Sequence, residues 1–466
     1  MKKAVIFIFL ILIMGSGISL KSCTKESLKV YQTDERLGGD LTVYDFSTNA
    51  FSLPAPALNG IDELNFFVGN SFFNQNWVTA PSSTTARDGL GPLFNARNCS
   101  ACHFKDGRGT PILPGMTGTE GFLMRISISG TDLHGGPNPD PSYGGQINDK
   151  SVSGVLPEAE VSVAFNFISG TYPDGSNYEL REPIYTISNL NYGALDPGIL
   201  YSPRVGNQMI GLGLLEAISE TDLLANADEF DSNGDGISGR ANYVWDYITN
   251  SQKIGRFGWK ANQPSLKQQV AGAFLGDIGI TTSLFQTENC TSPQQDCQNA
   301  PNGGSPELED EDLDKVVLYA SSLAVPARRN TNDPDVLKGK ELFFSVGCVS
   351  CHKYTFNTGI HPQFSHLSNQ RIFPFTDLLL HDMGSQLADN RPDYLADGNE
   401  WRTPPLWGIG LFETVNGHTY YLHDGRARNL EEAILWHGGE ATTVINRFKN
   451  LSKPERNQLI QFLKSL

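Results

Sequence analysis

The sequence predicts a mainly α-helical protein with long loops, built from two related units of which the first carries a large insertion. Three observations support this fold class. Glycine and proline supply 47 and 26 of the 466 residues, which exceeds their usual share and predicts long ordered loops between short elements. The pattern Cys-x-x-Cys-His occurs twice, at 99–103 and 348–352. Apolar residues with helical spacing lie at 336–344, before the second pattern, and at 459–466.

Composition and charge exclude several classes of protein. Only 18% of the residues are charged and 39% are hydrophobic, which excludes a charge-rich disordered chain and a membrane protein with many spans. The chain has 51 acidic and 35 basic residues, a formal net charge of −16. This charge repels the phosphate backbone of nucleic acids and attracts a basic protein partner. We therefore expect no nucleic-acid partner.

Residues 1–22 have the pattern of a bacterial export signal. Two lysines precede an apolar run over 4–14, which is short for a membrane span. Cys23 follows Leu20-Lys21-Ser22, which resembles the cleavage box of a lipoprotein, although a small residue is usual in place of the lysine. We expect lipidation of Cys23 and a location in the bacterial cell envelope, periplasmic or at the surface, with the membrane contacted through the lipid anchor only. An ordinary signal peptide or an uncleaved anchor is the alternative.

The two Cys-x-x-Cys-His patterns are typical of covalent haem attachment in an exported chain. Two thiols add to the vinyl groups of the porphyrin, and the adjacent histidine is placed to bind the iron. A zinc site would need two further ligands at each pattern, and a redox dithiol would not need the histidine twice. The sequence therefore predicts two covalently bound haem c groups. Their attachment residues are Cys99, Cys102 and His103 for the first, and Cys348, Cys351 and His352 for the second.

Two other cysteines form a separate pair. Cys290 and Cys297 lie in a polar segment without a neighbouring histidine. In an oxidising compartment a disulfide is the expected outcome, and a catalytic thiol pair is the alternative.

A repeated helix supports the division into two units. Apolar residues at 316–323 match those at 459–466 at a constant spacing, and the second stretch follows a capping box with a proline at 452–455. The sequence thus predicts two cytochrome-c-like haem domains, at 23–325 and 331–466. The first contains a large insertion between its haem motif and its closing helix. A chance match between two amphipathic helices is the alternative.

One segment of the insertion resembles part of a calcium loop. Residues 231–237 have oxygen-bearing side chains at alternate positions and glycine at the turn. The predicted calcium ligands are Asp231, Asn233 and Asp235, but Asn242 stands where the last glutamate of such a loop is expected. An acidic turn that binds no cation is the alternative.

Six further segments carry a family resemblance. They are GLLEAI at 213–218, GRFGWKA at 255–261, DIGIT at 277–281, HDMG at 381–384, WRTPPLWG at 401–408 and YYLHDGR at 420–426. With the two haem motifs, they make nearly all of the chain after residue 22 resemble the bacterial di-haem oxidoreductases. This group of peroxidase-like proteins, sometimes labelled thiol oxidoreductases, is related to the di-haem cytochrome c peroxidases and to the di-haem enzyme that matures methylamine dehydrogenase.

The resemblance implies an exported, peroxidase-like oxidoreductase. One haem, usually the first, is open on its distal side and reacts with peroxide or another small oxidant. The second haem is six-coordinate and relays electrons from an electron-donor protein. Two other functions remain open: a di-haem electron carrier without catalysis, and an oxidase that modifies a partner protein. A thiol oxidoreductase has little support, because only Cys290 and Cys297 are uncommitted.

The resemblance also implies iron ligands. His437 falls where related enzymes place a methionine or tyrosine, so we expect it to bind the second haem iron, with Met383 and His423 as alternatives. Six of the seven histidines outside the haem motifs follow the second motif, and His134 precedes it. His134 is the candidate that would close the first haem in a resting state.

Peroxide cleavage at the first haem requires a group that accepts a proton and returns it. By resemblance the catalytic candidates are Glu216 or Glu220, with Gln208 as a hydrogen-bonding neighbour. An aromatic ring between the haems would assist electron transfer, and Trp259 or Trp245 is the candidate. Helix-surface and packing roles are the alternatives for these residues.

Overall fold

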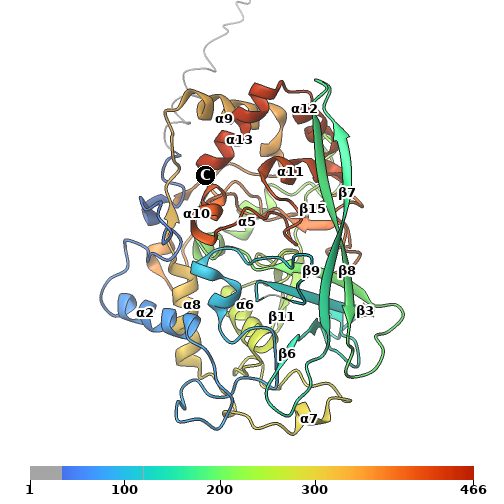
Figure 1. Ribbon diagram of the computed structural model, residues 1–466. Helices are drawn as coiled ribbons and strands as arrows, with labels where there is room; N and C mark the ends of the chain where they lie inside the picture. The colour runs from blue at the N-terminus through green and yellow to red at the C-terminus, as the bar shows by residue number, and fades with distance from the viewer. Residues whose placement is uncertain (1–33, 119) are drawn as a thin grey trace, which may run out of the picture. The chain divides into compact units, whose positions relative to one another are not determined.

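The described chain mixes short helices and short strands (Figure 1), and the prediction of a mainly α-helical protein is wrong. In this computed structural model 28% of the residues are helical and 20% lie in strands. It describes residues 34–118 and 120–466. The predicted export signal at 1–22 and the lipidation site Cys23 lie outside the described residues. Within the described ranges, no helix has the length and apolar character needed to cross a membrane.

The strands concentrate in the insertion of the first unit. There, β3 (Phe122–Thr131) and β7 (Glu160–Thr171) begin with alternating buried and more exposed residues, which is the period of a half-buried strand. The helical spacing near the haem motifs says nothing about this insertion. The helical prediction fails because the insertion follows a two-residue period instead.

The helices and strands of the described residues have the following bounds. The helices are α2 (Gly60–Asn74), α3 (Cys99–Cys102), α4 (Leu212–Glu216), α5 (Glu220–Leu224), α6 (Leu266–Ala273), α7 (Gln295–Gln298), α8 (Asp310–Ser322), α9 (Pro334–Val346), α10 (Phe412–Asn416), α11 (Leu430–Leu435), α12 (Thr442–Lys449) and α13 (Lys453–Ser465). The other strands are β1 (Thr42–Val43), β2 (Leu93–Phe94), β4 (Pro137–Asn138), β5 (Gln146–Ile147), β6 (Lys150–Ser151), β8 (Asn177–Ser188), β9 (Leu200–Val205), β10 (Tyr243–Asp246), β11 (Ser251–Ile254), β12 (Val325–Pro326), β13 (Phe356–Asn357), β14 (Arg371–Ile372), β15 (Leu380–Asp382) and β16 (Glu400–Arg402).

Next to the second haem motif, α9 packs against the closing helix α13. Gly339 of α9 lies so close to the Gln458 carbonyl that a Cβ atom would come within 1.9 Å of its oxygen. One turn later, the Phe343 ring contacts Phe462, with ring centroids 5.3 Å apart. A glycine therefore allows the backbones to approach, and an aromatic pair fills the space beside them.

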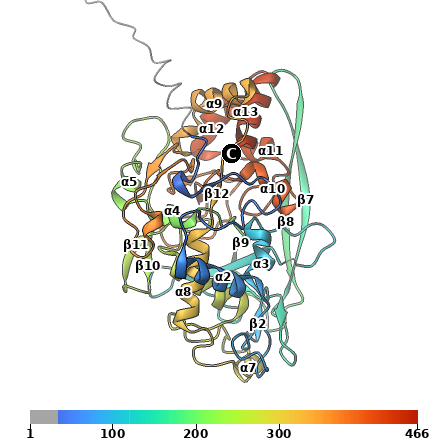
Figure 2. The same cartoon turned by 90° about the vertical axis from the view of Figure 1, so that its left-hand side faces the viewer.

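The same crossing occurs next to the first motif, where α2 packs against α8. A Cβ atom on Gly69 would lie 2.1 Å from the Lys315 carbonyl oxygen, and Phe73 contacts Tyr319 at 5.2 Å. Figures 1 and 2 show the pair α9 with α13 at the top of the view and the pair α2 with α8 in its lower half. The matching sequences of α8 and α13 thus occupy the same place in two helix pairs.

The insertion contributes a small sheet and a long hairpin. In the sheet β3 pairs with β4, β5 and β9, all antiparallel. β7 and β8 pair over their whole length, from Glu160 with Ser188 to Thr171 with Asn177. The tip of this ribbon is fastened to α13, where Arg456 donates a hydrogen bond to Asp174 at 2.8 Å.

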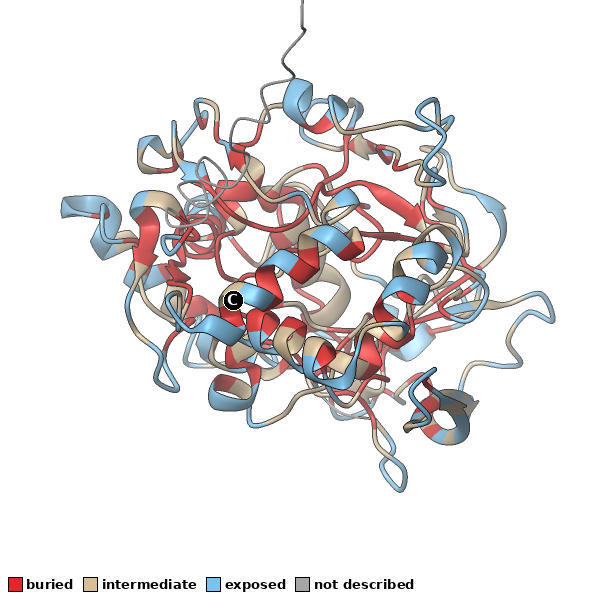
Figure 3. Cartoon of the chain, turned by 90° about the horizontal axis from the view of Figure 1, so that it is seen from above, coloured by how far each residue is buried: buried red, intermediate tan, exposed pale blue. Residues whose placement is uncertain are grey.

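The hydrophobic core is continuous across both predicted units. Residues 35–466 form one compact unit, and one connected cluster of buried side chains extends from Leu37 to Leu466. Figure 3 shows helices with buried faces toward the interior and exposed faces outward. The division into domains at 23–325 and 331–466 therefore stays a prediction, because the two halves share this core.

Candidate functional site

The second haem motif follows α9 directly. The helix ends at Gly347, whose φ of 107° favours glycine, and a short turn then presents Cys348. Cys348 and Cys351 are free thiols. Nδ1 of His352 donates to the Phe375 carbonyl at 3.0 Å. Burial, reinforced by the nearby His437 ring, lowers the pKa of His352 to about 4. The ring is therefore neutral, with the Nε2 lone pair free to bind a metal.

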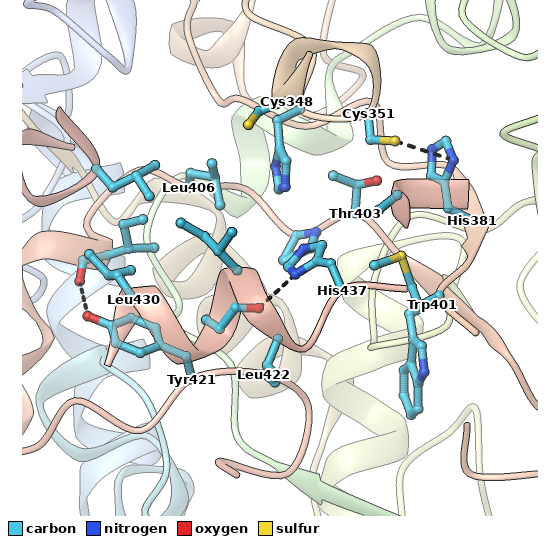
Figure 4. A pocket seen from close by; sticks show the side chains of 18 of the residues that line it. Cys348, Cys351, His381, Trp401, Thr403, Leu406, Tyr421, Leu422, Leu430 and His437 are labelled. Atoms are coloured by element: carbon cyan, nitrogen blue, oxygen red, sulfur yellow. Dashed lines mark hydrogen bonds between the residues drawn. The ribbon is translucent and has the colours of Figure 1, made fainter. Parts of the chain in front are cut away.

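A cavity of about 200 Å³ lies beside this motif. Its walls are largely apolar, which suits a flat hydrophobic macrocycle. They include Trp259, Phe343, Leu387, Trp401, Pro404, Pro405, Leu406, Ile409, Phe412, Leu430, Ile434, Val444, Leu459 and Leu463. Figure 4 shows Cys348 and Cys351 at one side of the cavity.

His437 projects into the same cavity from just beyond α11 (Figure 4). Its Nδ1 donates to the Ala433 carbonyl at 2.7 Å, and burial lowers its pKa. This is the arrangement of His352: a neutral imidazole with one nitrogen held by a backbone carbonyl and the other free. Two such rings facing one cavity can supply both axial ligands of one haem iron.

Three further candidates line this cavity: His381, and the two alternatives expected from the sequence, Met383 and His423. Nδ1 and Nε2 of His381 lie 2.8 and 2.9 Å from the carboxylates of Glu440 and Asp377. Burial opposes protonation, but these carboxylates outweigh it and raise the pKa of His381 well above its usual value. An imidazolium cannot bind iron. His423 stacks on Trp401, with centroids 3.8 Å apart, and burial lowers its pKa. His423 and Met383 therefore stay alternatives to His437.

The first haem motif begins at the short helix α3. The Asn98 side chain caps this helix by accepting from the Ala101 amide at 2.7 Å. Cys99 and Cys102 are free thiols. Nδ1 of His103 donates to the Asn207 carbonyl at 2.6 Å, and burial lowers the pKa of this histidine. The ring is again neutral with Nε2 free.

Another cavity, of about 320 Å³, lies beside the first motif. We call it the first cavity and the one beside the second motif the second cavity; the first cavity is the more polar of the two. Its lining includes Arg125, Arg204, Gln263, Gln269 and Asp277. Among the described residues that line it, His103 is the only histidine. Within its described lining, the first cavity therefore has no counterpart of His437, and the two cavities differ in the number of histidines that line them.

One wall separates the two cavities, and four side chains line both: Gln208, Trp259, Arg402 and Pro405. The indole Nε1 of Trp259 donates to the Val205 carbonyl at 2.9 Å. The Arg402 amide donates to the Trp259 carbonyl at 2.9 Å. The tryptophan ring is thus fixed between the two sites, as expected for one of the two tryptophan candidates. The arginine and proline in this wall were not among the sequence candidates, although both lie in the WRTPPLWG segment.

The predicted carboxylates lie elsewhere. Neither Glu216 nor Glu220 lines the first cavity, although Leu212 and Leu215 of α4 do. One Glu216 oxygen accepts from the Leu266 amide at 2.8 Å, and the other lies 3.2 Å from Nε2 of His361.

Glu220 is exposed at the start of α5. Of the three catalytic candidates, only Gln208 reaches the cavity, because its segment also supplies the carbonyl that holds His103. A contact between α4 and a histidine of the second unit had no signal in the sequence.

His134 and Trp245 lie together outside both cavities. Their rings stack, with centroids 4.4 Å apart and planes 17° from parallel. Neither residue lines either cavity. The structure therefore places neither His134 at the first haem site nor Trp245 between the haem sites.

The predicted calcium loop uses its oxygen atoms on its own backbone. Asp231 accepts from the Gly236 amide at 3.1 Å, and Asn233 accepts from the Asp235 amide at 2.8 Å. No group of three or more His, Cys, Asp or Glu side chains in the described ranges is arranged to hold a metal ion. The geometry is that of an acidic turn, and calcium binding stays a prediction.

Cys290 and Cys297 are joined in a disulfide. The loop that it closes contains Gln294, which is fully buried and donates to Glu158 at 2.7 Å. Burial raises the pKa of Glu158 to about 8. These two cysteines are thus in a bond that fastens a loop to the interior.

Comparison with known proteins now decides the family. The chain matches, over residues 31–466, the model of the family described as "Di-haem oxidoreductase, putative peroxidase". The chain belongs to this family. As a di-haem oxidoreductase it has two haem sites, and its two Cys-x-x-Cys-His motifs each open onto one of the two cavities. The family resemblance expected from the sequence is confirmed.

A curated relative points the same way. The di-haem oxidoreductase is 25% identical over 232 residues to a cytochrome c551 peroxidase of Nitrosomonas europaea. The alignment covers 47% of this chain and 63% of that protein. This likeness agrees with the family match, and the relative's activity is a statement about the relative.

Proposed function

We propose that this di-haem oxidoreductase is an exported peroxidase in which the first haem site reduces peroxide and the second relays electrons to it. One observation carries the proposal: both cavities have a haem motif with a free imidazole nitrogen, but only the second has another such histidine facing it. The second iron would be six-coordinate, bound by His352 and His437. The first, bound by His103, would keep one position for peroxide.

The residues present fit two covalently attached haem c groups. Each motif has two free thiols beside a cavity, and each motif histidine has its Nδ1 fixed by a backbone carbonyl. A haem supplies an iron that exchanges electrons with peroxide and with the other haem. The protein fixes the direction of each histidine ring, excludes water with apolar walls and places one site next to the other.

The shared wall supports electron relay between the sites. Trp259 lines both cavities and is held by hydrogen bonds at its indole nitrogen and its carbonyl. A fixed aromatic ring shortens the gap that an electron must cross. Gln208, in the same wall, is placed to donate a hydrogen bond to an oxygen-containing ligand of the first cavity.

Export follows from the same chemistry. Haem attachment to cysteines and a disulfide both belong to an oxidising compartment, and residues 1–22 with Cys23 provide the lipoprotein-type signal. Replacement of Cys23 with serine should move the protein from the membrane fraction to the soluble fraction. Retention in the membrane fraction would contradict lipid anchoring.

Electron paramagnetic resonance of the half-reduced, haem-loaded protein tests the proposal. Half-reduction silences the haem of higher potential. A high-spin ferric signal from the remaining haem is expected if the first site is open. Purely low-spin signals from both the fully oxidised and the half-reduced protein would overturn the peroxidase proposal and favour an electron carrier without catalysis.

Attachment is tested separately by mass. The intact denatured protein should carry the mass of two haems, and the double variant Cys348→Ala/Cys351→Ala should carry one. The control is the disulfide variant Cys290→Ser, which should keep both haems. Loss of both haems after mild acid extraction of the wild type would contradict covalent attachment.

A further inference from the structure

A chain of contacting rings leads away from the first cavity. Phe285 lines that cavity, and its ring contacts Tyr247, with centroids 5.3 Å apart. Tyr247 contacts His134 at 5.4 Å, and His134 stacks on Trp245 at 4.4 Å. No member of this chain is part of the wall between the two cavities.

Hydrogen bonds hold this chain to the cavity. The buried Gln268 side chain accepts from the Tyr247 amide at 2.8 Å and donates to the Trp245 carbonyl at 3.0 Å. It also donates to the side chain of Gln263 at 2.9 Å, and Gln263 lines the first cavity. The positions of the two oxidisable rings are therefore coupled to the cavity wall by a polar contact as well as by Phe285.

The loop that presents His134 is also fixed. Asp132 accepts hydrogen bonds from the amides of His134 and Gly136, at 2.8 and 2.7 Å. The φ of Gly135 is 84°, which a residue with a side chain rarely adopts. The imidazole is thus held against the indole by a tight turn.

The outer end of the chain lies at an apolar surface. Trp245 and Tyr247 are partly exposed at the β10–β11 hairpin, which Figure 2 shows at the edge of the described chain. Leu133, the neighbour of His134, is 93% exposed, and Ile248, the neighbour of Tyr247, is 46% exposed. Exposed aliphatic side chains beside aromatic rings favour contact with another flat ring.

We propose that Trp245 is a surface oxidation site for phenolic electron donors, connected to the first haem site through Tyr247 and Phe285. This inference rests on the proposed function, because the oxidant is peroxide reduced in the first cavity. It adds a donor site that is separate from the relay through Trp259. A donor too large to enter the buried cavity would react at this surface.

The electron balance is simple. Trp245 loses one electron, which passes by way of the His134 contact and Tyr247 to the first site, and a phenol then restores the indole by giving up one electron and releasing its hydroxyl proton. Two such events supply the two electrons that, with two protons, convert one hydrogen peroxide to two waters. The phenol leaves as a phenoxyl radical, so each peroxide consumes two phenols.

Peptide mapping provides a readout that is independent of turnover. The haem-loaded protein is treated with hydrogen peroxide without a donor, digested, and analysed by mass spectrometry for added oxygen. Oxidation is expected at Trp245 and Tyr247, and not at the fully buried Trp407. Tyr247→Phe should abolish the modification of Trp245. Tyr243→Phe, which changes an exposed tyrosine of the same strand outside the ring chain, should leave it unchanged.

Guaiacol oxidation completes the test. Trp245→Phe should lose oxidation of guaiacol and keep the wild-type rate at which peroxide changes the haem absorption. Two results would overturn the donor site and leave the proposed function standing. One is a haem that responds to peroxide while the added oxygen is found on residues other than Trp245 and Tyr247. The other is unchanged guaiacol oxidation in Trp245→Phe. A wild-type protein whose haem absorption does not respond to peroxide would overturn both.

Discussion

Replacement of Gly339 with alanine should loosen the helix pair beside the second haem site. An added Cβ atom would lie 1.9 Å from the Gln458 carbonyl oxygen and 2.9 Å from Cβ of Phe462. Neither group is the flexible end of a side chain, so α9 and α13 must move apart. Overpacking of this kind costs about 1–3 kcal/mol and occasionally more. With two rigid contacts we expect the upper end of this range, which exceeds the roughly 1 kcal/mol gained from the better helix propensity of alanine.

The Gly339→Ala substitution should also disturb the second haem site. Phe343 lies one turn beyond Gly339, lines the second cavity, and has its ring centroid 6.2 Å from that of His352. We therefore expect a lower denaturant midpoint together with a broadened absorption band of the second haem. Guanidinium titration of the haem-loaded protein, followed by circular dichroism and by haem absorption, measures both effects.

Gly276→Ala is the matched control. It lies in the helical segment 274–278 and lines neither cavity, and an added Cβ would meet no atom within 4 Å, so the substitution should stabilise the protein by up to about 1 kcal/mol. Gly69→Ala should repeat the loss at the first site, since its Cβ would lie 2.1 Å from a carbonyl oxygen. Wild-type midpoints for both Gly339→Ala and Gly69→Ala would refute the argument from close backbone contact.

Three further changes test other parts of the structure. His437→Ala should convert the second haem from low-spin to high-spin and make it bind imidazole added to the solution, and an unchanged low-spin spectrum would assign the sixth position to another residue. Glu158→Gln should remove a pH dependence of stability: the folded pKa of about 8 lies above the ordinary 4.5, so the wild type loses stability as pH rises between these values and the variant should not. Parallel thermal midpoints across that range would contradict this. Lys260→Met should lower the free energy of unfolding by about 3–5 kcal/mol, because it leaves the buried Asp389 carboxylate, 2.7 Å from the Lys260 ammonium group, without its partner. A denaturant midpoint within error of the wild type would show that the carboxylate takes up a proton instead.

The sequence located the haem motifs and the candidate for the sixth ligand, but it misjudged the fold class. Cys348, Cys351 and His352 are proposed to attach one group, and residues that do so must lie close in sequence, so their pattern is complete in a short segment. The apolar residues of α13 have helical spacing, so this helix could also be predicted from a short segment. The strands of the insertion were not predicted because the helical spacing that supported the fold class lies in segments near the haem motifs, whereas the insertion has a two-residue period.

A spacing shared by α2 and α9 could have predicted the first helix pair from the sequence. Gly69 and Phe73 of α2 have the same spacing as Gly339 and Phe343 of α9. This repeat was a usable signal for α2. It is separated from its haem motif by a longer segment than the repeat in α9, so adjacency to the motif did not identify it.

The sequence by itself identified the residues proposed to attach the haems, because thiols and an adjacent histidine act within a few residues of each other. Only the tertiary structure decided which side chains line each cavity. His437 reaches the second cavity across a large sequence separation, whereas Glu216 turns away from the first cavity to His361. Trp259 becomes a shared wall only when two distant halves pack around one core. Residues that act together over a few positions can be recognised from the sequence, but which side chains line a cavity depends on which distant segments the core brings into contact.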